Sequence, residues 1–184
     1  MIKKLAGKTG MSLMEMMASL LILVLLIVGM NTGMTAGLRV YETSKITTER
    51  SMLASSINTK LTDILRYAEV RKVNDKTLYT NLEYGLWDVT FEVPQKNDSR
   101  FSANEEGKVQ ICFWDKTGNN LVKATPLINS SSYSNFKVTD FICHPPGKNP
   151  DTNTQYCHIS YKLLNTGDNS TSDLIEAVVR IMNE

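Results

Sequence analysis

The sequence has no large excess of either charge. Across 184 residues, 20 Lys and Arg stand against 19 Asp and Glu, so the net charge is +1. A general nucleic-acid or polyanion binder needs a clear basic excess, so no direct nucleic-acid binding is expected. Only 10 glycines and 5 prolines are present, too few for a collagen-like or linker-dominated chain. Hydrophobic residues make up 42 % and charged residues 21 %, which excludes a wholly disordered chain.

The sequence also lacks familiar catalytic motifs, with no GxSxG, GxxxxGK[ST], GxGxxG or HExxH. Its two histidines, His144 and His158, each follow a cysteine, a pattern that suggests a Cys₂His₂ zinc site. Adjacent residues on a strand point to opposite faces, which argues against the four converging on one metal. Asp151 and Asn153 suggest a calcium loop, but the central Gly and closing Glu of an EF-hand are missing. We therefore expect no enzyme, no metal and no cofactor.

Charge is absent from the whole stretch between Glu15 and Arg39. A bilayer-spanning helix needs about 20 mostly apolar residues, and residues 18–30 read ASLLILVLLIVGM. A core helix of this length without a polar face would be unusual in so small a protein. The sequence therefore predicts a transmembrane helix over residues 11–38. Basic residues flank it almost equally, and the N-terminal amine tips the N-terminus towards the cytoplasm.

Three interpretations of this N-terminal segment compete. A secretory signal would end in small residues, and Thr35-Ala36-Gly37 offers a late cleavage site. A plain single-pass anchor needs no particular residues before the apolar run. The third interpretation uses residues that the first two leave without a role. A short basic leader ends at Gly10, MSLMEMM follows, and Glu15 is the fifth residue after the glycine.

This arrangement resembles the prepilin signal of type IV pilins and pseudopilins. The resemblance implies that prepilin peptidase removes the leader, residues 1–10, by cutting after Gly10, and that Met11 is then N-methylated. Phe is commoner than Met at this position in the family, and a proline often found along the apolar helix is absent here. The implied partners are other pilin-like subunits, a membrane assembly platform and, before assembly, the lipid bilayer. The implied location is a single-pass cytoplasmic membrane protein with an extracytoplasmic C-terminal domain, and then a cell-surface filament.

Glu15 has a physical argument of its own. A carboxylate within a transmembrane segment costs a few kcal/mol unless it is paired. After cleavage, the new amine of Met11 would lie four residues earlier on the same helix face. The pair would close within one chain or, as the family implies, between neighbouring chains. The alternative is an interfacial Glu at headgroup level.

Gly29, Gly33 and Gly37 form a GxxxGxxxG pattern. Such spacing permits close helix–helix approach in a membrane. Alternatively, the glycines soften the helix in place of the missing proline, since each costs about 1 kcal/mol of helix propensity relative to Ala. An accidental glycine cluster near the membrane exit is the third possibility.

The remainder of the sequence predicts an α+β fold in which a long N-terminal helix packs on an antiparallel sheet, as in pilins. No proline precedes Pro94, and apolar residues recur at helical spacing, so residues 39–72 are expected to continue the helix as an amphipathic segment. Residues 73–184 are expected to form the sheet. Alternation predicts six strands, near 86–93, 108–114, 121–124, 135–142, 156–164 and 174–182.

Cys143 and Cys157 flank a polar, proline-containing loop. A disulfide there would close about 15 residues and contribute about 3 kcal/mol in the chain-entropy model. It also resembles the disulfide-bounded C-terminal loop of many pilins, and we predict this pairing with Cys112 reduced. Three cysteines allow three single pairings, and the sequence alone leaves them open.

The leading functional expectation is a structural subunit, a minor pilin or pseudopilin, of a type IV pilus-like filament. The alternative is a membrane-anchored or filament-tip binding module, adhesin-like, with an exposed β domain. A membrane-tethered enzyme is a third class, which predicts a cleft with convergent polar groups.

Overall fold

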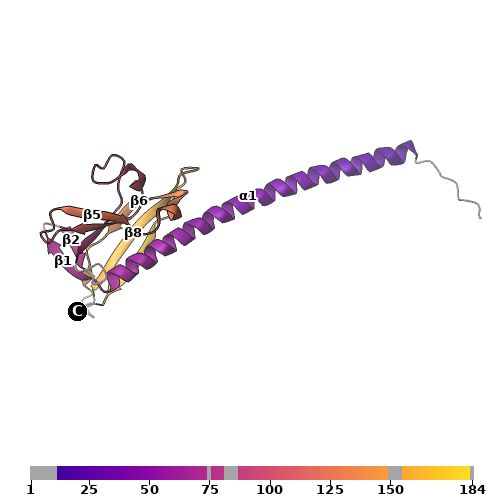
Figure 1. Cartoon of the computed structure of the whole chain (residues 1–184). Coiled ribbons are helices and arrows are strands. Elements are labelled where there is room, and N and C mark those ends of the chain that lie inside the picture. The colour runs from indigo at the N-terminus through magenta and orange to yellow at the C-terminus, as the bar shows by residue number, and fades with distance from the viewer. Residues whose placement is uncertain (1–11, 74–75, 81–86, 149–154, 183–184) are drawn as a thin grey trace, which may run out of the picture. The chain divides into compact units, whose positions relative to one another are not determined.

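The computed structural model describes residues 12–73, 76–80, 87–148 and 155–182. The chain divides into two compact units, Met1–Thr48 and Glu49–Glu184. One helix, α1 (Leu13–Arg66), has residues in both units and is followed by the strands (Figure 1). The predicted cleavage site, Gly10 and Met11, lies outside the described residues.

In the first unit, α1 carries apolar side chains on every side. The side chains from Leu20 to Val28 are each 50–65 % exposed, so no face of this segment is covered. Polar side chains in and beside the run bond to the helix itself, since the hydroxyls of Thr32 and Thr35 donate to the carbonyls of Val28 (2.9 Å) and Asn31 (2.8 Å). Such internal satisfaction is what a bilayer requires. By length and composition, α1 is long and apolar enough to cross a membrane.

The second unit contains two antiparallel sheets. The first is a meander, in which each strand pairs with the next along the chain: β1 (Glu69–Val73), β2 (Lys76–Thr80), β3 (Asp88–Glu92), β4 (Gln110–Trp114) and β5 (Leu121–Pro126). In the second, the long β8 pairs with three strands: β6 (Phe136–Cys143), the two-residue β7 (Gly147–Lys148) and β9 (Ile175–Ile181); β8 itself is Gln155–Asn165. Short 3₁₀ helices lie at Ala103–Glu105 and Ser130–Tyr133.

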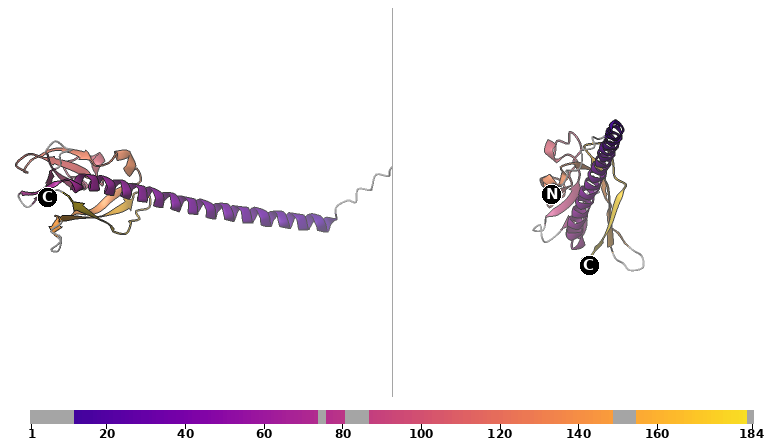
Figure 2. Two further views of the ribbon diagram at one scale, coloured as in Figure 1. Left: turned by 90° about the horizontal axis from the view of Figure 1, so that it is seen from below. Right: turned by 90° about the vertical axis from the view of Figure 1, so that its right-hand side faces the viewer.

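The C-terminal turns of α1 lie between the two sheets (Figure 2) and supply much of the core. The fully buried residues of these turns share one face at helical spacing: Leu53, Ile57, Leu61, Ile64 and Leu65. Tyr161 of β8 joins helix and sheet, because its hydroxyl donates to the Ala54 carbonyl (3.1 Å) and also bonds to Asn58 Oδ1 (3.0 Å). The apolar stripe predicted from the sequence therefore faces the sheets.

The α+β class, with one long N-terminal helix and antiparallel sheets, is confirmed, and all six expected strands are present. The strands form two sheets rather than one. The helix ends at Arg66 instead of continuing to residue 72, and Glu69–Val73 is a strand that pairs with β2. A tertiary contact accounts for the end of the helix at Arg66. The Arg66 carbonyl accepts a hydrogen bond from the Met182 amide, near the other end of the chain (2.7 Å).

Candidate functional site

The first candidate site is the N-terminus of α1, where Ser12 and Glu15 cap the helix. The Ser12 amide donates to Glu15 Oε2 (3.0 Å), and the Met14 amide donates to Ser12 Oγ (3.3 Å). The Glu15 contact is one arm of a capping box, the S-x-x-E pattern, whereas the Ser12 hydroxyl caps the amide of Met14 rather than that of Glu15. The carboxylate also lies where the helix dipole favours negative charge. Sequence reasoning missed this role, although the letters SLME contain its signature.

Among the described residues, Ser12 bonds to the Glu15 carboxylate through Oε2, and the Glu15 side chain is exposed. Because Met11 lies outside the described residues, pairing of Glu15 with the Met11 amine stays a prediction. The capping geometry is compatible with it, since cleavage after Gly10 would leave the Ser12 amide in place.

Gly29, Gly33 and Gly37 all lie inside α1. A Cβ atom built on any of them meets nothing within 4 Å. Among the described residues of this chain, therefore, no contact requires a residue as small as glycine at these positions. Close helix approach and softening of the helix both remain predictions that concern a second helix or an assembled state.

The second candidate site is the pair Cys143 and Cys157, which the two strands β6 and β8 bring together. Cys143 is opposite Ile159, so Cys157 is its diagonal neighbour on the same face. The two sulfur atoms lie 3.4 Å apart as free thiols. The Tyr79 hydroxyl, from the first sheet, contacts both sulfurs at 3.5 and 3.4 Å.

The third cysteine lies elsewhere. Cys112 is opposite Thr90 in the first sheet, whereas Tyr79 is opposite Val89, the residue before Thr90. Cys112 and Tyr79 therefore occupy opposite faces of that sheet, and the sheet separates Cys112 from the other two thiols. Burial, followed by the nearby Glu92 carboxylate, raises the pKa of the Cys112 thiol to about 12. The buried Cys112 is thus a poor nucleophile at neutral pH.

The thiols of the pair differ in acidity. A hydrogen bond from Cys143 to the Cys157 sulfur lowers the pKa of Cys157, and the same bond, followed by burial, raises the pKa of Cys143. The thiolate is the form that attacks an oxidant or a disulfide.

We expect peptide mapping without reductant to recover Cys143 and Cys157 as one linked pair and Cys112 as a free thiol. The Cys157→Ser variant should lose about 3 kcal/mol of unfolding free energy in the oxidised protein, since the loop constraint disappears. Cys112→Ser is the control and should leave the linked peptides unchanged. Recovery of Cys112 in the bridge, or of three free thiols in extracytoplasmic material, would contradict the assignment.

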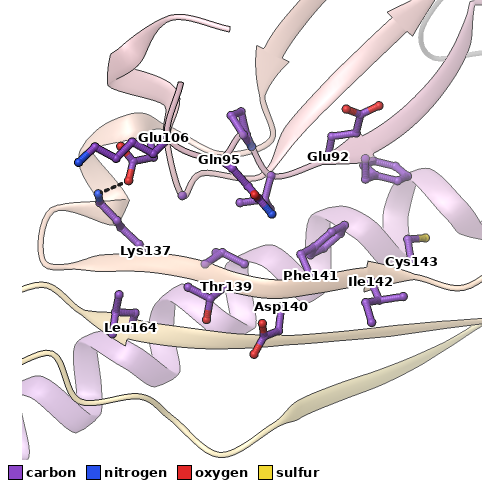
Figure 3. Close-up of a pocket in the computed structure, with 16 residues that line it drawn as sticks. Glu92, Gln95, Glu106, Lys137, Thr139, Asp140, Phe141, Ile142, Cys143 and Leu164 are labelled. Carbon is purple, nitrogen blue, oxygen red and sulfur yellow. Dashed lines mark hydrogen bonds and ion pairs between the residues drawn. The ribbon is translucent and has the colours of Figure 1, made fainter. Parts of the chain in front are cut away.

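The third candidate site is a cleft of about 660 Å³ between the two sheets. Figure 3 shows Phe141 and Cys143 projecting from one side of β6 and Asp140 and Ile142 from the other, and all four line the cleft. At the rim, the Lys137 ammonium lies 2.8 Å from Glu106 Oε1. The cleft is lined by apolar side chains such as Phe91 and Val138 and by polar ones such as Glu92 and Gln95.

The two Cys-His dipeptides do not form a Cys₂His₂ site. Cys157 is buried against Tyr79, whereas His144 and His158 are exposed. In the part of the chain that the structure describes, no three His, Cys, Asp or Glu residues lie together as metal ligands. Asp151 and Asn153, the suggested calcium ligands, lie outside the described residues.

Comparison with protein-family models, with curated proteins and with solved structures gives no match for this chain.

Proposed function

We propose that the protein is a structural subunit, a minor pilin or pseudopilin, of a type IV pilus-like filament. In this proposal prepilin peptidase cuts the precursor after Gly10, and the mature chain assembles through its N-terminal helix. The supporting observation is the exposed apolar segment of α1, in which every side chain from Leu20 to Val28 is at least half exposed. Such a surface needs lipid or neighbouring helices to cover it.

The other features of the helix fit the same proposal. Glu15 is the one charged residue between Lys8 and Arg39, and its exposed carboxylate would pair with a cation of a neighbouring chain. The three glycines on α1 leave open space around their backbone, which a second helix would fill. The bilayer holds the subunit before assembly, and other subunits replace the lipid in the filament.

A second candidate function is that of a filament-tip or membrane-anchored binding module. The observation that favours it is the cleft between the sheets, whose apolar floor and charged rim are typical of ligand sites. Position in the filament separates the two functions, because a structural subunit should be found along the filament and a tip subunit only at its end.

Processing of the N-terminus is the direct test of the leading proposal. The N-terminal peptide of the mature protein should begin at Met11 and be one methyl group heavier than the unmodified peptide. Gly10→Leu should block this cleavage and leave the precursor in the membrane. Gly7→Leu, a matched change inside the same leader, should leave processing intact. A mature chain beginning near Ala36 or Gly37 would establish an ordinary secreted domain instead.

A further inference from the structure

His144, one residue beyond the end of β6, and His158 of β8 are hydrogen-bonded neighbours. The His144 amide donates to the His158 carbonyl at 2.8 Å, which continues the register in which Cys143 is opposite Ile159. Side chains of directly opposite residues lie on the same face, with Cβ atoms about 4.5–5.5 Å apart. Ile142, two residues before His144, projects from the side of β6 opposite Cys143 (Figure 3) and is exposed. Both histidines are exposed, so this face leaves them open to solvent.

The backbone that carries His144 is held firmly although His144 lies just beyond the end of β6. Its carbonyl accepts a hydrogen bond from the Tyr79 hydroxyl (3.5 Å) on the inner side. Two prolines, Pro145 and Pro146, follow it directly and restrict its backbone. His158 lies in the middle of β8 and is paired on its other side with Val178 of β9. The two imidazoles thus start from backbone positions that are already fixed relative to each other.

We propose that His144 and His158 form a bidentate surface site for a divalent transition-metal ion of the zinc, nickel or copper type. Imidazole nitrogen is the ligand that these ions favour, at about 2.0–2.1 Å for zinc. A fixed backbone reduces the conformational entropy lost when both rings bind one ion. Among the described residues no third His, Cys, Asp or Glu completes a cluster, so water fills the remaining coordination positions. The site is distinct from the thiol pair, which faces the core on the other side of β8.

The test uses the full chain in detergent micelles with Zn²⁺ as the probe. These are the two histidines of the chain, so their imidazole proton signals are directly assignable by NMR. Both signals should shift together during one Zn²⁺ titration. Calorimetry should give one site per chain, which His144→Gln and His158→Gln each weaken by at least about tenfold.

Two control variants separate this site from the alternatives. Ser160→Gln changes a neighbouring residue on the same face of β8 and should bind Zn²⁺ like the wild type. Cys157→Ser removes a thiol on the opposite face and should also retain binding. Loss of binding in Cys157→Ser but not in His158→Gln would overturn the proposal, as would a wild-type chain whose imidazole signals ignore Zn²⁺. A thermal melt of each variant without metal identifies any loss caused by unfolding, and in that case His144→Asn and His158→Asn replace the Gln variants.

Discussion

Replacing Glu15 with glutamine should leave the protein in the membrane with its leader removed, yet reduce its incorporation into filaments at least about tenfold. Glutamine serves in a capping box as glutamate does, so the bond from the Ser12 amide is retained and only the charge is lost. In the proposed filament, the Met11 amine would then be buried among apolar helices without a counter-ion, at a cost of several kcal/mol. A difference of about 1.4 kcal/mol is already a tenfold change in an equilibrium.

The measurement compares wild-type and Glu15→Gln subunits in sheared filament and membrane fractions. Glu15→Ala removes the charge and the cap together, and should be no better incorporated than the glutamine variant. Ser12→Ala is the matched control, because it weakens the cap at the Met14 amide and keeps the carboxylate. It should assemble nearly as the wild type. Equal incorporation of the glutamine variant would show that charge pairing does not place this subunit.

Truncation of Leu61 to alanine should destabilise the β domain by about 2–5 kcal/mol. Leu61 is fully buried on the face of α1 that lies between the two sheets, so its loss leaves a cavity where helix and sheets meet. For a chain of this size, such a loss corresponds to a fall of roughly 5–20 °C in melting temperature. The melt is followed in detergent micelles by tryptophan fluorescence, since Trp114 is buried in the first sheet.

Met52→Ala is the control for Leu61→Ala. Met52 lies on the same helix but is 65 % exposed, and its truncation should change the unfolding free energy by no more than about 0.5 kcal/mol. Equal melting temperatures for Leu61→Ala and the wild type would show that the helix stripe does not support the domain. The two predictions act on different halves of α1, so one can fail without the other.

The helix and the strands were largely predictable from local patterns. The stripe from Leu53 to Leu65 has the period of a helix, and the apolar residues of β6 and β8 alternate with the period of a strand. Long patterns of this kind identify a helix or a strand without tertiary information. The exception is β1, whose sequence EVRKV is polar and mostly exposed, with the pattern of neither a buried strand nor a helix end. It is a strand because β2 pairs with it, and α1 stops before it because Met182 bonds to the Arg66 carbonyl.

Some features of the candidate sites also follow from the sequence alone, whereas others depend on the tertiary structure. The sequence by itself determined the apolar segment, because the run without charges is a property of composition that needs no partner to be recognised. It also placed Glu15 at the edge of that run. Only the tertiary structure shows which thiols are close. The register of β6 on β8 brings Cys143 to Cys157, while the first sheet separates Cys112 from both, and the disulfide itself stays a prediction. The same pairing brings His144 next to His158, and both are exposed. The physical reason is that strand pairing joins residues far apart in the chain, and no local pattern specifies which residues become opposite.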